Sequence, residues 1–147
     1  MKDFSHHGHT RYDHSLRVAY HTYKVTKALH LNYEEATIAA LLHDFFTDEV
    51  IAEKSINRMR HHPKVAAKNA SKYFSINEKQ KNMIETHMFP VTLSPPTYLE
   101  GWLLDLVDDV VAIYEKVTSL ENSKKAYPKK RLNPVASILL LIITVFK

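Results

Sequence analysis

The stretch ALLHDFF, residues 40–46, places a histidine and an aspartate side by side in a run that otherwise has the pattern of a buried core. Apolar residues precede His43 and Asp44 and two phenylalanines follow them, so neither has a solvent-facing stripe to lie on. A buried carboxylate is costly unless its charge is compensated, and a bound cation is one of the few partners that compensates it well. The pair therefore indicates a metal site, because a purely structural helical domain would leave Asp44 unexplained.

His14 is the first of three further histidines at defined places beside predicted buried surface. Val18, Val25 and Leu29 share its helix face, so we expect the His14 side chain to point inward. An inward histidine can be either a hydrogen-bonded core residue or a metal ligand.

His62 and His87 lie near prolines that mark predicted helix ends. Pro63 disfavours a helical conformation for His62, which we therefore expect at a helix N-terminus, where the helix dipole favours the neutral imidazole that a metal binds. His87 falls in the last turn of a helix that ends before Pro90. A cation interacting with that helix C-terminus is an alternative role for it.

A long predicted helix carries three aspartates in the segment WLLDLVDDVVAIYE. The predicted apolar stripe of this helix consists of Trp102, Leu106, Val110 and Ile113. Asp109 lies on or near that stripe, whereas Asp105 and Asp108 are one turn apart on an adjoining face. Spacing does not decide which aspartate is functional, and a solvated acidic face accounts for at least one of them.

The elements that must position these residues are predicted to be helices. Only two glycines occur among 147 residues, whereas a sheet protein with many tight turns would use more, so the fold class is all-α. Asn32 with Glu35, and Ser75 with Glu78, have the spacing of capping boxes at helix starts. The predicted helices span residues 12–30, 33–45, 48–59, 63–74, 77–88, 97–119 and 134–146. These six to seven helices are expected to pack as a compact single-domain bundle.

The chain divides into an expected domain, residues 1–121, and residues 122–147, a basic linker followed by an apolar segment. Five positive charges lie in KKAYPKKR, and the rest of the chain has a formal charge of −1, so nucleic acid is not expected as the main partner. The run VASILLLIITVF is shorter than the roughly 20 residues that a transmembrane helix needs. We expect it to pack on the domain or on a second subunit of a homodimer.

The chain contains no cysteine, which excludes disulfides, a thiolate zinc site and a cysteine nucleophile. The N-terminal segment MKDFSHHGHTRYDH has no apolar region of the kind found in signal peptides. The expected location is the cytoplasm, with which both features are compatible.

The histidines and aspartates occur in the order His … His-Asp … His … His … Asp, and each member of this order lies on a separate predicted helix. This pattern resembles the HD-domain superfamily of metal-dependent phosphohydrolases. The resemblance runs over roughly residues 7–116, from HGHTRYDHSLRVAY through LLHDFF, HHPKVAAKNA and IETHMFP to LVDDVVAIYE. It implies that one metal ion is held by His14, His43, Asp44 and Asp108. Asp108 is preferred because LVDD matches the family's segment of two aliphatic residues and an aspartate, which leaves Asp109 where a lysine is common.

Members of this superfamily with a second metal ion use further histidines between the His-Asp pair and the last aspartate. His62 and His87 match those places, so the resemblance implies a dinuclear site bridged by Asp44. Two positions depart from the family pattern. Met88 stands where many dinuclear members have a second consecutive histidine, and Thr47 stands where one subgroup has a phosphate-contacting lysine, which disfavours a cyclic-dinucleotide phosphodiesterase of that subgroup.

Imidazole and carboxylate ligands suit one or two ions of Mn, Fe, Ni or Zn better than Ca²⁺. Such ions lower the pKa of bound water from about 15.7 toward about 7 and neutralise charge on phosphoryl oxygens. We therefore expect a metal-dependent phosphohydrolase, a phosphomonoesterase or phosphodiesterase, that acts through a metal-activated water on a nucleotide or other small phosphorylated substrate. Asp44 would be its pivotal catalytic residue. The alternative is a non-catalytic metal-bearing module for ligand binding or regulation.

Arg11 and Arg17 lie one turn either side of His14 and are candidates for contact with a substrate phosphate. Most arginines are exposed to solvent on the protein surface. Each of the two could therefore be either a surface residue or a substrate contact.

Overall fold

The structure is a computed structural model that describes residues 5–6, 9–46 and 55–123. Its elements are β1 (Ser5–His6), β2 (His9–Thr10), α1 (Arg11–Ala28), α2 (Tyr33–Leu42), α3 (Ser55–Tyr73), α4 (Glu78–Thr86) and α5 (Leu99–Ser123). The two strands form one short antiparallel pair, and all other regular elements in these ranges are helices. The all-α prediction is confirmed. The predicted helix 134–146, residues 48–54 of the predicted helix 48–59, and Thr47 lie outside the described residues.

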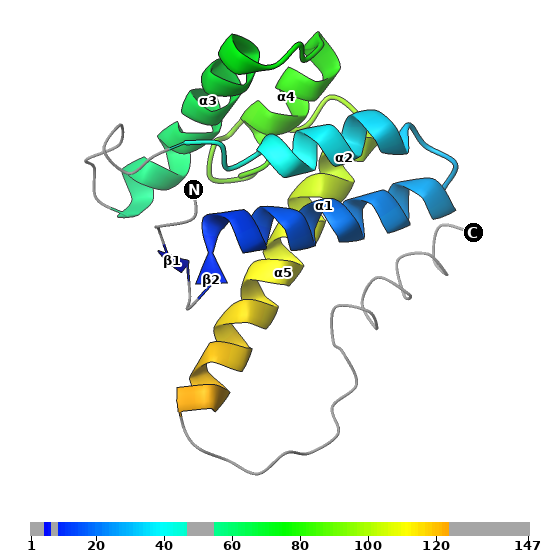
Figure 1. Cartoon of the computed structure of the whole chain (residues 1–147). Coiled ribbons are helices and arrows are strands. Elements are labelled where there is room, and N and C mark those ends of the chain that lie inside the picture. The colour runs from blue at the N-terminus through cyan, green and yellow to red at the C-terminus, as the bar shows by residue number, and fades with distance from the viewer. Residues whose placement is uncertain (1–4, 7–8, 47–54, 124–147) are drawn as a thin grey trace.

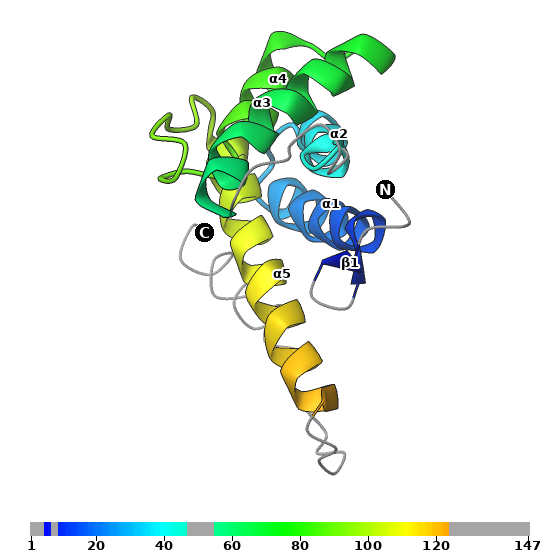
Figure 2. The same cartoon turned by 90° about the vertical axis from the view of Figure 1, so that its left-hand side faces the viewer.

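The helices pack around α2 (Figure 1). α1 and α2 run antiparallel and side by side, α3 and α4 lie on the other side of α2, and α5 crosses α1 at a steep angle. In the second view the C-terminal part of α5 extends well beyond the other four helices (Figure 2).

Small alanine side chains on α2 and α3 allow the neighbouring helices to approach them closely. The fully buried alanines are Ala36, Ala39 and Ala40 on α2 and Ala66, Ala67 and Ala70 on α3. Because alanine also has the highest helix propensity, these segments gain close packing without a cost in local stability. The end of α2, where the His-Asp pair lies, is thereby held against its neighbours. None of the described helices has the length and apolar character needed to cross a membrane.

Helix starts are set by side-chain caps. Thr10 begins α1 through a capping box with Asp13, and Asn32 caps α2 by accepting a hydrogen bond from the Glu35 N–H. The predicted box of Ser75 with Glu78 is wrong, because Asn77 and Gln80 form it instead. Asparagine is as good an N-cap as serine, and Gln80 reciprocates by accepting from the Asn77 N–H at 2.9 Å.

Helix α3 differs most from the prediction. Two helices, 48–59 and 63–74, were expected to meet at Pro63, but α3 continues through this proline, so His62 is not at a helix N-terminus. Pro63 has no N–H to give to the Met59 carbonyl, a local cost. Burial of the alanine face of α3 offsets this cost, because tertiary packing outweighs local propensity.

The predicted apolar stripe of α5 is also largely wrong. Trp102, Leu106 and Ile113 are exposed, and only Val110 among the four is buried. The buried apolar face consists of Leu103, Leu104, Val107 and Val111. Both faces are apolar enough to pack on a core. The face adjoining Asp108 is the one buried, because the histidines of α1 and α2 lie opposite that carboxylate.

Glu100 connects three helices near the start of α5. Its buried carboxylate accepts hydrogen bonds from the Lys79 ammonium at 2.8 Å and from the Asn32 backbone N–H at 3.3 Å. Lys79 also pairs with Glu35 on α2 at 3.3 Å. Burial opposes ionisation of Glu100, but these partners hold its pKa below the usual value.

We predict that Glu100→Gln lowers the free energy of unfolding by about 1–2 kcal/mol at neutral pH, because a buried carboxylate loses charge-assisted hydrogen bonds. A carboxylate whose pKa is lowered by folding stabilises the protein above its unfolded pKa and loses that contribution as the pH falls through the folded pKa. The difference between wild type and variant should therefore shrink between about pH 6 and about pH 3 in urea unfolding experiments. Glu78→Gln, at an almost fully exposed side chain, is the control. A difference that does not change with pH would contradict this role.

Candidate metal centre

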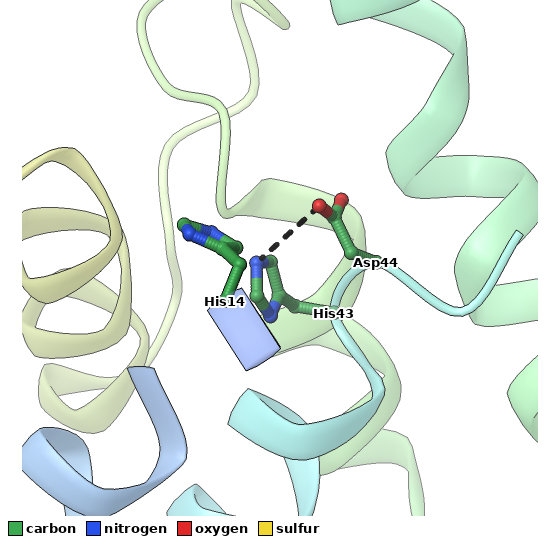
Figure 3. A group of neighbouring side chains, drawn as sticks. All are labelled: His14, His43 and Asp44. Atoms are coloured by element: carbon green, nitrogen blue, oxygen red, sulfur yellow. Dashed lines mark ion pairs between the residues drawn. The ribbon is translucent and has the colours of Figure 1, made fainter. Parts of the chain in front are cut away.

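Six polar side chains from all five helices or their ends converge on one buried point. They are His14 on α1, His43 and Asp44 at the end of α2, His62 on α3, His87 at the end of α4, and Asp108 on α5. All six are at most 9% exposed. Figure 3 shows the His14 and His43 rings and the Asp44 carboxylate turned toward a common space between α1 and the end of α2. The structure thus brings all six predicted residues together.

The distances divide the cluster into two neighbouring groups. Asp108 Oδ1 lies 2.8 Å from His14 Nε2 and 3.4 Å from His43 Nε2. Asp44 Oδ2 lies 3.9 Å from His43 Nε2, the pair joined by the dashed line in Figure 3.

Asp44 Oδ1 faces the other group, at 3.4 Å from His62 Nε2 and 3.9 Å from His87 Nε2. The two oxygens of Asp44 therefore face different histidines.

The outer nitrogen of every ring is held by an acceptor. Nδ1 of His43 lies 2.7 Å from the Ala40 carbonyl, Nδ1 of His87 lies 2.7 Å from the Ile84 carbonyl, and Nδ1 of His62 lies 3.0 Å from the Arg58 carbonyl. A carbonyl oxygen can only accept, so each Nδ1 carries a proton and donates it. The lone pair of each neutral ring is consequently on Nε2, which points into the cluster.

This arrangement fits a cation. Nε2 of His62 and Nε2 of His87 are 3.0 Å apart, so two neutral rings with protonated Nδ1 atoms direct lone pairs at each other. Nε2 of His43 is buried and has no hydrogen-bond partner within the described part of the chain. Lone pairs that converge without donors between them are compensated well by a metal ion, and each ring's Nδ1 bond is the usual support of a histidine ligand.

Electrostatics keep His62 and His87 neutral and the aspartates ionised. Burial, together with charge on His43 and His62, lowers the pKa of His87 to about 3, and burial also lowers the pKa of His62. Burial opposes ionisation of Asp44 and Asp108, but the surrounding histidines hold the pKa of both carboxyls below its usual value. At neutral pH the cluster therefore offers imidazole lone pairs and carboxylates, both of which bind transition metals.

His14 and His43 differ from His62 and His87. Burial lowers the pKa of all four rings, but the carboxylates beside His14 and His43 outweigh burial and raise the pKa of both. Hydrogen bonds to Asp108 and Glu115 raise the pKa of His14 to about 10. Without a cation, its ring is thus protonated and paired with Asp108. A metal ion bound at Nε2 would replace that proton, as metal ligation by histidine generally requires.

Three sets of donor atoms, each within 4.8 Å of one another, could hold an ion: His14 with His43 and Asp44, His43 with His87 and Asp108, and Asp44 with His62 and His87. Asp44 takes part in two of these sets, one on each side of the cluster. The chemistry of the donors suits divalent transition metals, since all are imidazoles or carboxylates.

Glu115 is a site residue that the sequence interpretation missed. It is fully buried; its Oε2 accepts from His14 Nδ1 at 3.0 Å and its Oε1 accepts from Arg17 at 2.7 Å. It orients the His14 ring as the backbone carbonyls orient the other three. The signal was available, because Glu115 lies seven residues after Asp108, two helical turns along the same face.

Both candidate phosphate-binding arginines have partners inside the protein. Arg11 is buried, donates to the Phe46 carbonyl at 2.9 Å and lies 4.1 Å above the centre of the Phe46 ring. It therefore fixes the segment that follows Asp44. Arg17 is bound to Glu115. Contact of either arginine with a substrate stays a prediction.

The other two aspartates of α5 do not contribute to any described donor set. Asp105 is buried, and burial together with the charges of Asp109 and Asp108 raises its pKa to about 7. Asp109 is exposed, as expected for a solvated acidic face.

The family model described as HD domain matches residues 11–122. This range runs from the start of α1 almost to the end of α5 and contains the six residues of the cluster and Glu115. No curated protein and no solved structure gives a significant match to the chain.

We predict that Glu115→Gln weakens binding of Mn²⁺ or Zn²⁺ by about 10- to 100-fold, the usual effect of removing a carboxylate that supports a histidine ligand. The dissociation constant would be measured by competition with a chelating indicator, and a thermal melt of the metal-free protein would check folding. Glu78→Gln is the matched control, since that side chain is almost fully exposed on α4. Equal affinity of Glu115→Gln and wild type would show that Glu115 does not support the metal.

Proposed function

The chain belongs to the HD-domain family, and from this premise we propose that it is a metal-dependent phosphohydrolase. Its substrate would be a nucleotide or another small phosphorylated molecule, and the reaction would be hydrolysis of a phosphoester bond. One observation carries the proposal: four imidazole Nε2 atoms with fixed Nδ1 protons face two buried, ionised aspartates. Such a donor set has little use in a purely structural core, because its lone pairs and charges would stay uncompensated.

The proposed ligands form two groups that share Asp44. His14, His43, Asp44 and Asp108 would hold one ion, and His62, His87 and Asp44 would hold a second. The orientation of the Asp44 carboxylate supports sharing, since its Oδ2 faces His43 and its Oδ1 faces His62 and His87. Mn, Fe, Ni and Zn are the candidate metals.

Bound divalent cations would make a water molecule nucleophilic at neutral pH and offset the charge on phosphoryl oxygens. The chain's own residues would prepare this chemistry. Burial opposes ionisation of Asp44, but the neighbouring histidines, His43 first, hold its pKa below the usual value. Burial lowers the pKa of His62 and His87, so both rings stay neutral. The carbonyls of Ala40, Arg58 and Ile84 hold the three rings in the ligating tautomer. These hydrogen bonds within the chain fix the orientation of the rings, which would lower the reorganisation cost of the reaction.

A metal-bearing module without turnover is the second candidate function. The observation that favours it is the engagement of both nearby arginines, since Arg11 holds Phe46 and Arg17 holds Glu115. At least one guanidinium nitrogen of each arginine is thereby engaged within the protein. Met88, in place of a second consecutive histidine, also removes one potential ligand from the family pattern.

We predict that the purified protein retains a divalent metal and, with Mn²⁺ or Fe²⁺, hydrolyses a chromogenic phosphodiester or a member of a nucleotide panel. Asp44→Ala and Asp44→Asn should both lose metal and turnover, because the central carboxylate is removed from both groups. Metal content would be measured by elemental analysis and turnover by phosphate or chromophore release.

Asp109→Asn is the control, because Asp109 is an exposed aspartate outside the donor sets. Retained metal without hydrolysis of any substrate in the panel would favour the regulatory module. Unchanged metal content in Asp44→Asn would refute the ligand assignment itself.

A second prediction concerns the number of ions. His87→Ala should lower the bound metal from two ions to one per chain, because the group formed with His62 and Asp44 loses a ligand while the His14 group is intact. Native mass spectrometry after titration with Mn²⁺ or Zn²⁺ would count the ions. His61→Ala, at an exposed histidine beside His62, should bind as many ions as wild type. An equal number of ions in His87→Ala and wild type would contradict the dinuclear assignment.

A further inference from the structure

Helix α5 carries a second, exposed apolar face that has no role in the metal centre. It consists of Leu99, Trp102, Leu106, Ile113 and Val117, each at least 40% exposed, with Ile113 at 63%. We refer to these five residues as the α5 stripe.

The α5 stripe is narrow and straight. At about 100° per residue its five members fall within an arc of about 60° on the helix surface. The five residues are separated by three, four, seven and four positions in the sequence. Contact residues of helices that pack nearly parallel or antiparallel have the same spacing. Apolar side chains scattered singly over a surface need no explanation, but an aligned row over about five turns of one helix indicates a partner.

The described helices do not cover this stripe. The C-terminal part of α5 extends beyond α1 to α4 in both views (Figures 1 and 2). Ile113 and Val117, in the C-terminal half of the helix, are 63% and 40% exposed. Near the other end, Trp102 packs edge-on against Phe89 with ring centres 5.2 Å apart, but it is still 43% exposed.

We infer that residues 134–146 of the same chain pack against the α5 stripe as its partner. This segment, PVASILLLIITVF, is apolar at nearly every position, so it presents an apolar face whichever side it turns to α5. Pro134 suits the first position of a helix. Burying the two apolar surfaces against each other removes both from water, which neither achieves alone.

The connecting chain is long enough. Residues 124–133 can span about 33 Å when extended. The part of the stripe from Leu106 to Val117 is about 16 Å long, and residues 134–146 would cover about 20 Å as a helix. A helix that turns back after residue 133 can therefore run antiparallel to α5 along this part of the stripe.

The covalent connection favours this occupant over a second copy of the chain. A segment joined to α5 through a linker of only ten residues, 124–133, has a local concentration of roughly millimolar, far above that of another protein molecule in dilute solution. The linker itself is suited to solvent, since it carries Lys124, Lys125, Lys129, Lys130 and Arg131. The proposal does not depend on the metal chemistry.

Disulfide trapping tests the proposal directly, because the natural chain contains no cysteine. Ile113→Cys would be combined in the full chain with one cysteine in turn at Ile138, Leu139, Leu140 or Leu141, four positions that sample a full helical turn. After mild oxidation, at least one of the four pairs should give a cross-linked monomer on a non-reducing gel. Proteolysis of that monomer should release two peptides joined by a disulfide, one containing residue 113 and the other containing the partner position. Glu78→Cys in place of Ile113→Cys is the control and should not cross-link, since Glu78 is exposed on α4.

The products distinguish the possible occupants. A cross-linked dimer through the same pair would overturn the proposal in favour of a second copy. No cross-link from any of the four pairs would overturn it in favour of an uncovered stripe or another partner.

Hydrogen exchange gives an independent measurement that does not rely on cysteine geometry. The double variant Leu106→Glu, Ile113→Glu should increase amide exchange in residues 134–146 at least tenfold, because charges on the α5 stripe disfavour docking. Both substituted side chains are exposed, so α1 to α4 should keep their exchange rates. The same exchange in residues 134–146 of wild type and variant would contradict the proposal.

Discussion

The arrangement of this structure depends on how the charges of two buried carboxylates are compensated. Asp44 and Asp108 lie at the centre of the bundle, where ionised groups are strongly destabilising unless other groups compensate their charge. Each is faced by imidazoles rather than by lysine or arginine. Imidazoles can give up a proton and bind a cation instead, which lysine and arginine cannot do in this way. The burial that makes these aspartates costly is thus also what makes the cluster suitable for metal ions.

The histidines are positioned by helix ends as much as by packing. His43 and His87 are both C-cap residues, and in each the ring Nδ1 donates to a carbonyl three residues earlier, Ala40 or Ile84. The last carbonyls of a helix have no backbone donor, so the ring satisfies one of them and is fixed in return. α2 and α4 therefore each position a histidine of the cluster in the same way. His14, on the first turn of α1, donates from Nδ1 to the carboxylate of Glu115 on α5 instead.

The sequence pattern predicted much of this arrangement, and its errors have physical causes. The ALLHDFF run, the shortage of glycine and the order of histidines and aspartates predicted the helical class and the six clustered residues. Pro63 was expected to end a helix because local propensity opposes a proline in a helix interior, yet α3 continues through it. The face of α5 was misassigned because both candidate faces are apolar. Only the position of the opposing histidines makes the Asp108 face the buried one.

What the sequence by itself determined is the set of chemical groups and the helical periods that carry them, because residue types and local propensities are properties of short segments. Which groups meet was decided by the tertiary structure, since contacts between residues as distant as His14 and Glu115 depend on how α1 and α5 cross. The tertiary structure also determined the tautomer of each ring and the partners of Arg11 and Arg17. A hydrogen bond depends on the distance and direction of its partner, and no period along the chain encodes either.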